Sequence, residues 1–138
     1  MNNAMAIAAS GMAAAQVSLT ASASNIANME TTGPVPATPP SQPVPQGAGN
    51  AYQPVTATLS AQPSGGVTAS ISSTLPSYTL AYDPSAPFAN MQGMVAAPNV
   101  DPASQVVNQM SASLAFRANL AVFKTADKTF QSLLDTLA

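Results

Sequence analysis

All thirteen prolines of this 138-residue chain lie between Pro34 and Pro102, so both ends are free of proline. Proline lacks a backbone N–H and its ring clashes with the preceding turn, so it breaks a helix interior. Long helices are therefore permitted at the ends and excluded from the middle. We expect a mainly α fold in four parts: an N-terminal helix in 1–30, a Pro-rich linker in 31–53, a small β or irregular module in 54–100, and a C-terminal helix in 101–138.

The N-terminal segment carries apolar residues at a heptad spacing, which predicts a helix over about 3–29. The positions repeating every seven residues are Met5, Met12, Leu19 and Ile26, and those three residues further on are Ala8, Ala15, Ser22 and Met29. Between them stand Ala and Ser rather than the charged residues of a solvated coiled coil. This small, uncharged surface suits close packing against further helices.

The C-terminal segment repeats this design over about 102–137. Its stripe consists of Phe116, Leu120, Phe123, Phe130, Leu134 and Leu137, with Asp127 at the intervening position. Asp101 followed by Pro102 is typical of an N-cap and a first helical residue. Because each helix can cover the other's stripe, we expect the two to pair as an antiparallel coiled coil. The stripe residues of both helices are the predicted packing and assembly residues.

The middle contains two kinds of sequence. Residues 33–50 are Pro-rich and have almost nothing apolar to bury, which predicts a polyproline-like or disordered tract. Residues 54–82 instead show three short runs in which apolar residues alternate with Thr or Ser, separated by Pro/Gly turns. These runs predict three short strands, which must lean on a helix or on a neighbouring subunit for stability.

The scarcity of charge and the lack of reactive residues exclude several functions. Charged residues make up 6% of the chain and the net charge is −2, which favours association over a free monomer. Three basic residues are too few for a nucleic-acid surface. With no Cys and no His, we expect no metal, no cofactor and no disulfide. Asp83 is the only carboxylate between Thr31 and Val100 and is predicted to form a turn, so we expect no enzyme.

The N-terminus also bears on targeting. It has no Lys or Arg before the apolar run, and Ser10, Gln16 and Thr20 interrupt that run. We therefore expect neither a cleaved signal peptide nor a membrane span. A secreted amphipathic helix that binds membranes is an alternative, but it needs a basic polar face, which residues 1–29 lack.

Short motifs at the two ends resemble the flagellar rod and hook protein family. The N-terminal motifs are Ala9-Ser10-Gly11-Met12, Leu19, Ser24-Asn25-Ile26-Ala27-Asn28 and Thr31-Thr32-Gly33. The C-terminal motifs are Asn99-Val100-Asp101, Met110 and Ala115-Phe116-Arg117-Ala118-Asn119, with Phe116 where Tyr is commoner. Thr32-Gly33-Pro34 and the stretch from Tyr82-Asp83-Pro84 to Pro98-Asn99-Val100 are similar to the proximal-rod members. The Pro-rich tract and the charge-poor middle depart from that pattern.

The resemblance implies a structural subunit of the bacterial flagellar basal-body rod, located in the periplasm and exported through the flagellar type III apparatus without a cleaved signal. It implies helical polymerisation with further copies and with other rod proteins into a torque-transmitting shaft, whose core is formed by the terminal helices. Another axial protein (rod protein B, a distal-rod or a hook type) is the alternative. The family's polar signature residues are Asn25, Asn28, Asn99 and Asn119. Asn28 is predicted to be a helix C-cap or an intersubunit contact, and Asn119 to have a specific partner.

Overall fold

The computed structural model describes residues 2–36 and 49–137, and this part of the chain forms two long helices and four strands. The helices are α1 (Asn2–Ala27) and α2 (Pro102–Leu137). The strands are β1 (Val55–Ala61), β2 (Val67–Ser73), β3 (Tyr78–Tyr82) and β4 (Met94–Pro98). Both predicted helices and all three predicted strands are confirmed, whereas β4 was not predicted. Most of the predicted Pro-rich tract, residues 37–48, lies outside the described residues.

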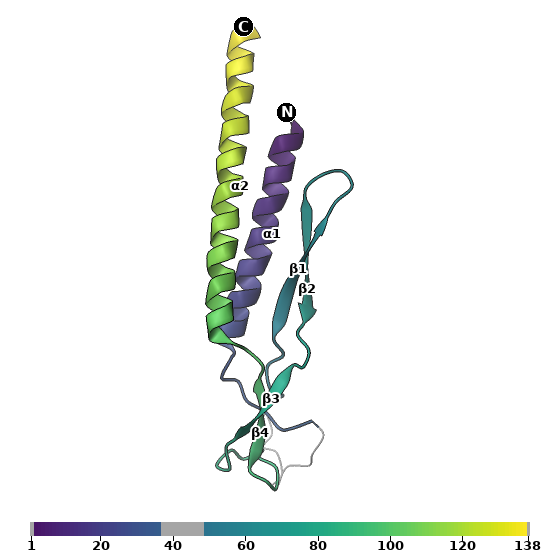
Figure 1. Cartoon of the computed structure of the whole chain (residues 1–138), viewed down its shortest axis with the longest axis vertical. Coiled ribbons are helices and arrows are strands. Elements are labelled where there is room, and N and C mark those ends of the chain that lie inside the picture. The colour runs from purple at the N-terminus through teal and green to yellow at the C-terminus, as the bar shows by residue number, and fades with distance from the viewer. Residues whose placement is uncertain (1, 37–48, 138) are drawn as a thin grey trace.

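The two helices run antiparallel, side by side, and form the long axis of the molecule (Figure 1). The β1–β2 hairpin lies along α1, on the other side of that helix from α2, and the β3–β4 pair lies at the end where α1 stops and α2 starts. The architecture is therefore mainly α with a middle of small antiparallel strands. Helix α1 is the central element, because it alone touches both α2 and the hairpin.

Helix α2 starts at a side-chain cap. The two carboxylate oxygens of Asp101 accept hydrogen bonds from the backbone N–H groups of Ala103 at 3.3 Å and Ser104 at 3.1 Å, and the Ser104 hydroxyl also donates to this carboxylate. These hydrogen bonds favour the charged form and lower the pKa of Asp101. Pro102 is the first helical residue, where its missing N–H leaves no bond unmade. The predicted cap is confirmed.

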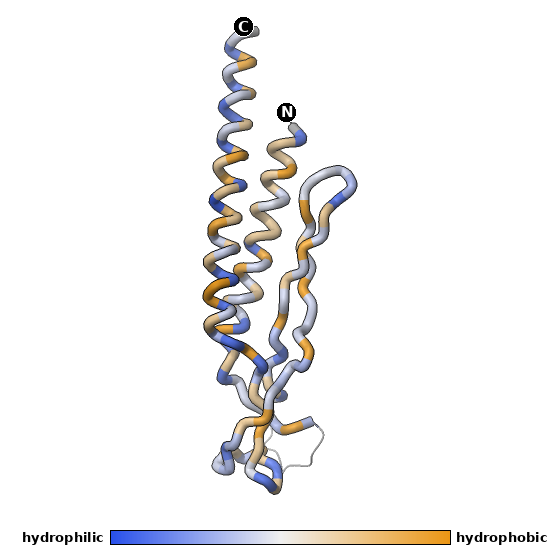
Figure 2. Tube along the Cα trace, in the orientation of Figure 1, coloured by the Kyte–Doolittle hydropathy of each residue, from blue (hydrophilic) through white to orange (hydrophobic). Residues whose placement is uncertain are grey.

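The surface that α1 buries is made of small side chains. Its fully buried residues are Ala8, Ala14, Ala15, Ala21, Ser22 and Asn25. The larger residues of the predicted stripe are placed differently: Met5, Met12 and Ile26 are half-buried, and Leu19 is 41% exposed. Ala8, Ala15 and Ser22 are the stripe positions next to these larger residues. Figure 2 shows apolar and weakly polar residues along most of α1.

Helix α1 also meets, by length and composition, the requirement for crossing a membrane over Asn3–Ala27. The sequence-based exclusion of a span on apolar content was therefore wrong, because many alanines offset the interrupting hydroxyl groups and Gln16. Core helices and signal sequences meet the same requirement. In this structure one face of α1 is covered by α2 and another by the hairpin.

The two strand pairs are separate two-stranded sheets. In the hairpin, Ala57 pairs with Ile71 and Leu59 with Ala69, so these four side chains share one face. Its turn contains Gly65 and Gly66 at φ values of 88° and 91°, which only glycine adopts readily. In the other sheet, β4 holds Val95, the largest fully buried side chain among the described residues, and Ala96 bridges to Gly33 in the segment after α1.

Candidate functional site: the helix pair and its hairpin

Asn25, near the end of α1, joins three elements through one buried amide. Its Nδ2 donates to the carbonyl of Val55 at 2.8 Å and to Oε1 of Gln105 on α2 at 3.1 Å. Its Oδ1 accepts from the backbone N–H of Val55 at 2.9 Å and from the hydroxyl of Tyr52 at 3.1 Å. Asn25 is only 3% exposed, so each of these bonds replaces one to water that folding removes. Burial raises the pKa of the Tyr52 hydroxyl.

A second polar contact holds the hairpin near its turn. The hydroxyl of Ser10 donates to the carbonyl of Ile7 at 2.7 Å and accepts from the backbone N–H of Val67 at 3.1 Å. Gly66 lies so close that a Cβ added there would be 2.5 Å from the Ser10 Oγ. The glycine thus provides the turn conformation and the close approach together.

The spacing of these two contacts matches the length of the hairpin. Ser10 and Asn25 are fifteen residues apart on α1, which is about 22 Å at 1.5 Å per residue. Strand β1 has seven residues, or about 24 Å at 3.4 Å per residue. The hairpin is therefore fastened to α1 at both ends, with Val55 at one contact and Val67 at the other. This fixes its register on the helix.

Helices α1 and α2 are in close contact at Gly11. A Cβ added to Gly11 would lie 2.5 Å from Oδ1 of Asn119. Asn119 Nδ2 donates to the carbonyl of Ala115 at 2.9 Å, one turn earlier in α2. Asn119 therefore has a defined polar partner within its own helix, and its side chain covers the glycine. Small residues at such a crossing allow a short distance between helix axes.

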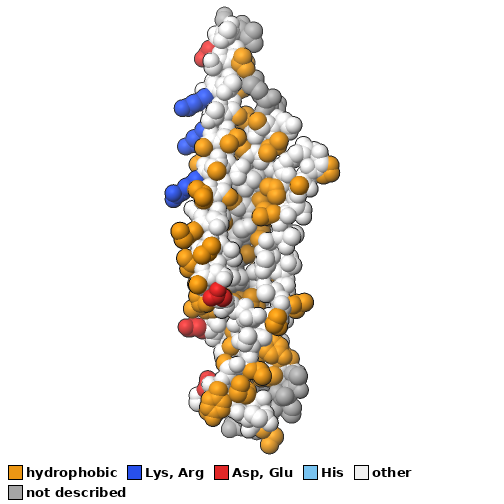
Figure 3. All heavy atoms as spheres, viewed as in Figure 1, with side chains coloured by type: hydrophobic (Ala, Val, Ile, Leu, Met, Phe, Trp, Pro, Cys, Tyr) orange, Lys and Arg blue, Asp and Glu red, His pale blue; other side chains and the backbone are white. Residues whose placement is uncertain are grey.

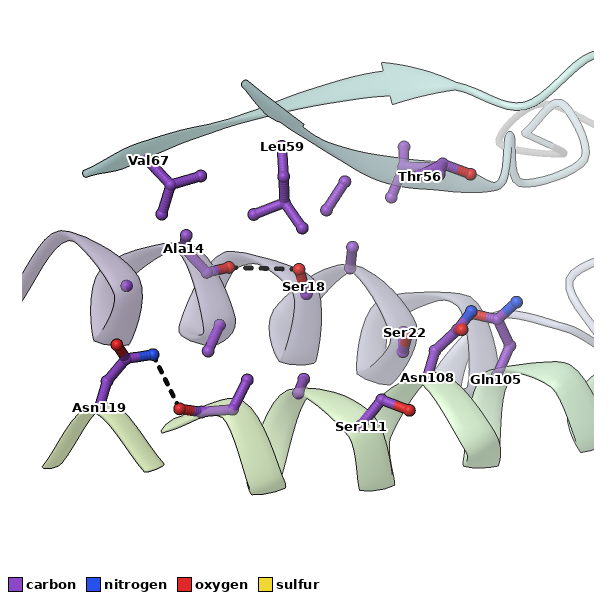
Figure 4. Close-up of a pocket in the computed structure, with 17 residues that line it drawn as sticks. Ala14, Ser18, Ser22, Thr56, Leu59, Val67, Gln105, Asn108, Ser111 and Asn119 are labelled. Atoms are coloured by element: carbon purple, nitrogen blue, oxygen red, sulfur yellow. Dashed lines mark hydrogen bonds between the residues drawn. The ribbon is translucent and has the colours of Figure 1, made fainter. Parts of the chain in front are cut away.

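A half-open groove of about 510 Å³ runs along α1 between α2 and the hairpin. Figure 4 shows Ala14 and Ser18 of α1 at its floor, Leu59 and Val67 of the hairpin on one side, and Asn108, Ser111 and Asn119 of α2 on the other. Its lining is apolar or carries hydroxyl and amide groups. No charged side chain lines it, so the groove suits packing against another chain rather than chemistry.

The remaining signature residues also have defined positions. Asn28 follows the last residue of α1, and its Nδ2 donates to the carbonyl of Ser24 at 2.9 Å. It thus caps the helix end through its side chain, and its backbone is not left-handed, since no described residue other than glycine has a positive φ. Asn99 donates from Nδ2 to the carbonyl of Pro76 at 2.9 Å, which ties the start of α2 to β3.

The predicted stripe of α2 is only partly covered within one chain. Leu120 and Phe123 are half-buried, whereas Phe116, Phe130 and Leu134 are exposed to differing degrees. For Phe130 and Leu134 the cause is length: α2 has 36 residues and α1 has 26, so α2 extends beyond the start of α1 (Figure 1). Phe116 lies alongside α1, three residues before the Asn119 that contacts Gly11, and is 38% exposed. The side chain of Leu137 lies outside those described. The role of these residues in assembly stays a prediction.

The described residues contain no group of three or more His, Cys, Asp or Glu side chains that could hold a metal ion. Asp83 accepts hydrogen bonds from the backbone N–H of Ser85 at 3.1 Å and from its hydroxyl at 2.6 Å, which confirms the predicted turn. Helix α1 thus makes close packing contacts with α2 and the hairpin, and side-chain hydrogen bonds of Ser10 and Asn25 hold these elements together.

Each terminal helix overlaps a region that matches a family model over nearly its whole length. Residues 5–34 match the model described as "Flagella basal body rod protein", and residues 91–136 match the model described as "Flagellar basal body rod FlgEFG protein C-terminal". The motifs that contain Ser10, Gly11 and Asn25 fall in the first region, and Asn99 and Asn119 fall in the second. The two matches place the chain in the class of flagellar rod structural proteins.

Relatives make the assignment more specific. The flagellar basal-body rod protein FlgC of Salmonella typhimurium is 37% identical over 124 residues, covering 86% of this chain and 84% of that protein. FlgC of Aquifex aeolicus is 30% identical over 131 residues, covering 94% and 91%. FlgC of Buchnera aphidicola from Schizaphis graminum is 44% identical over 55 residues, and this alignment spans only 40% of either chain. The chain therefore belongs to the FlgC family of flagellar basal-body rod proteins.

Proposed function

We propose that this protein is a structural subunit of the proximal part of the flagellar basal-body rod, and that it acts by assembly and not by catalysis. The observation that carries the proposal is that the two regions matching rod-family models form one antiparallel helix pair, fastened together by their own signature residues Gly11, Asn25 and Asn119. Because α1 and α2 come from opposite ends of the sequence, the helix pair can form only after both helices have reached the site of assembly.

We further propose that the helix pair behaves as an antiparallel coiled coil once neighbouring subunits cover it. Phe116, Phe130 and Leu134 would then pack between subunits, together with Leu19 of α1. In this organisation, 1–30 and 101–138 form the rod core, 54–100 is the small β module and 31–53 is a linker. The partners are further copies and other rod proteins, joined helically into a shaft that transmits torque.

Export through the flagellar type III apparatus without a cleaved signal, and a place in the periplasmic rod, belong to the same proposal. The contacts of α1 support this part of the proposal. Cleavage after Ala23 would remove Ser10, which binds the hairpin, and Gly11, which contacts α2. The test is mass spectrometry of the chain in purified basal bodies. We expect a peptide that begins at residue 1 or 2, and a chain beginning at Ser24 would contradict the proposal.

A membrane-inserted α1 is the second candidate, favoured by the length and apolar composition of Asn3–Ala27. The rod subunit needs the contacts that Gly11 and Asn25 make with α2 and the hairpin. A membrane-spanning α1 would be surrounded by lipid and would not need these contacts for its function. Detergent extraction of membranes separates the two candidates: a rod subunit stays with detergent-insoluble basal bodies, whereas a membrane anchor is solubilised by detergent alone.

The decisive experiment is deletion of this gene in its own flagellated host, followed by complementation. We expect the deletion to stop swimming, with basal bodies that lack the distal rod in electron micrographs. We expect the wild-type chain to restore both and to be found in purified basal bodies. Normal rods in the deletion strain would overturn the proposed function.

A further inference from the structure

The few charges of this chain are unevenly placed along its length. All three basic residues, Arg117, Lys124 and Lys128, are exposed on α2. They are spaced by seven and four residues, so at 3.6 residues per turn they share one face of the helix. That face lies opposite Ala112 and Asn119, which face α1. Figure 3 shows the basic groups in blue along one edge of the molecule. We call these three residues the basic stripe.

Two of the five acidic residues lie at the other end of the helix pair. Glu30 follows α1 and Asp101 caps α2, and both are exposed. We call these two residues the acidic junction. Asp83 follows β3 at the far end of the β3–β4 pair and is half-buried. The other two acids are on α2: Asp127 accepts a hydrogen bond from Gln131 at 3.0 Å, and Asp135 lies two turns beyond Lys128.

The basic stripe and the acidic junction of one chain are too far apart to interact. Lys124 is 23 residues from Asp101 along α2, which corresponds to about 34 Å. At physiological ionic strength, charges are screened over about 8 Å. The two groups therefore do not neutralise each other within one chain, and they are complementary in charge.

Exposed apolar side chains accompany both charged groups. Between the start of α2 and the basic stripe, the same outer face of the helix carries Val107, Met110 and Leu114, which are 60%, 68% and 70% exposed. The β3–β4 end carries Leu80, Tyr82 and Met91, which are more exposed than half. Exposed apolar groups gathered on one face mark surfaces that bind another protein.

We infer that the outer face of α2 binds the acidic junction and the β3–β4 end of a second copy displaced along the long axis. Bringing the acidic junction level with the middle of the basic stripe requires a displacement of about 32 Å. The β3–β4 end of the second copy then lies beside Val107, Met110 and Leu114, because five-residue strands span about 17 Å. A single displacement thus brings the acidic junction to the basic stripe and the exposed apolar residues of the β3–β4 end to those of α2.

The contact joins two different surfaces, so in a pair of copies each copy keeps one surface unused. Such a heterologous contact repeats without limit when the rotation does not close, and it generates a helical assembly. The inference rests on the proposed function and adds the two surfaces through which neighbouring copies meet.

Crosslinking tests this contact directly, since the chain has no cysteine and gives no background. Ala121 lies within the basic stripe and Thr31 adjoins Glu30, and both are exposed. The variant Ala121→Cys/Thr31→Cys, treated in purified basal bodies with a short bismaleimide, is expected to give dimers and higher oligomers. Each single variant is expected to give none. Within one chain the two positions are about 30 Å apart, so a link between them joins two copies.

A charge swap adds a control for geometry. In the double-cysteine chain, Lys124→Glu with Lys128→Glu is expected to reduce crosslinking by about tenfold, because like charges then face each other. Adding Glu30→Lys is expected to restore most of it. Dimers from either single-cysteine variant would show a symmetric contact instead and would overturn the inference.

The outcomes separate this inference from the proposed function. If the chain is present in basal bodies and the double-cysteine variant gives no chain–chain product, the inference is wrong and the proposed function stands. A product that contains only a different rod protein, identified by mass spectrometry, would overturn it equally. If the chain is absent from basal bodies, both fail.

Discussion

A Cβ atom added at Gly11 of α1 would lie 2.5 Å from Oδ1 of Asn119 on α2, so the helices meet where only glycine leaves the asparagine amide in place. Two effects compete in the substitution Gly11→Ala. Alanine favours a helix over glycine by about 1 kcal/mol, whereas overpacking costs about 1–3 kcal/mol. In the native chain the steric cost is expected to win, because Asn119 would have to give up its bond to Ala115.

The double-mutant cycle makes this first prediction specific. We expect Gly11→Ala to lower the midpoint of thermal unfolding in the native chain, and to raise it by an amount equivalent to about 0.5–1 kcal/mol in the Asn119→Ala background. Circular dichroism measures both. Equal effects of Gly11→Ala in the two backgrounds would show that the contact is not tight.

Asn25 and Asn28 offer a matched pair for the second prediction. Asn25→Ala leaves the N–H and carbonyl of Val55 and the Tyr52 hydroxyl without their partner in a buried site, and is expected to cost about 2–4 kcal/mol. Asn28→Ala removes one local bond at a half-buried helix end and is expected to cost about 0.5–1 kcal/mol. Urea unfolding of both variants checks the difference. Similar costs would contradict the role of Asn25 as the junction of three elements.

The distribution of prolines predicts the two helices well, because proline acts locally on its own turn. The same holds for the Asp101 cap and the Asp83 turn, whose partners lie within three residues. Asn25 was recognisable as a signature residue, but its partners Val55 and Gln105 are 30 and 80 residues away. No local pattern identifies such partners.

The fourth strand and the buried face of α1 were harder to predict for two other reasons. Met94–Pro98 shows no alternation, since both Val95 and Ala96 are buried, and it ends in proline. On α1, the heptad pattern includes the large residues Met5, Met12 and Leu19 as well as Ala8 and Ala15, but only the small positions are buried, beside the close contact at Gly11. Steric fit between helices depends on the partner, which the sequence of α1 alone does not contain.

Acid should weaken the start of α2, which is the third prediction. The pKa of Asp101 is lowered in the folded chain, so its contribution to stability is fully present above its unfolded value of about 3.9 and is lost as pH falls through the lower folded value. Asparagine also caps helices but does not titrate in this range. The stability advantage of the native chain over Asp101→Asn should therefore shrink between about pH 5 and pH 2. An advantage that does not change with pH would contradict this.

The fourth prediction concerns the part of α2 that extends beyond α1. All described side chains from Lys128 to Thr136 are exposed, and an isolated helical turn is marginal in water. In hydrogen exchange on the dilute monomer, we expect weak protection in 129–136 and stronger protection around Asn25 and Val95. In assembled rods the protection of 129–136 should rise. Protection that is uniform along α2 in the monomer would contradict the need for a neighbour.

The fifth prediction compares two adjacent residues of α2. Phe123 lies on the stripe with Phe116 and Phe130 and is half-buried, whereas Val122 is 52% exposed. Complete burial makes Phe→Ala cost about 3–5 kcal/mol, so we expect about 2 kcal/mol in the monomer and the full amount once a neighbouring subunit covers the ring. A surface change such as Val122→Ala should stay within about 0.5 kcal/mol.

These costs translate into assembly. We expect the strain carrying Phe123→Ala to export the protein but to form no complete rod and not to swim in soft agar, because the lost packing is repeated at every subunit. The Val122→Ala strain should swim normally. Immunoblots of the exported fraction distinguish failed assembly from failed synthesis. Normal swimming of the Phe123→Ala strain would remove the α2 stripe from the assembly surfaces and would point to the groove beside α1 in its place.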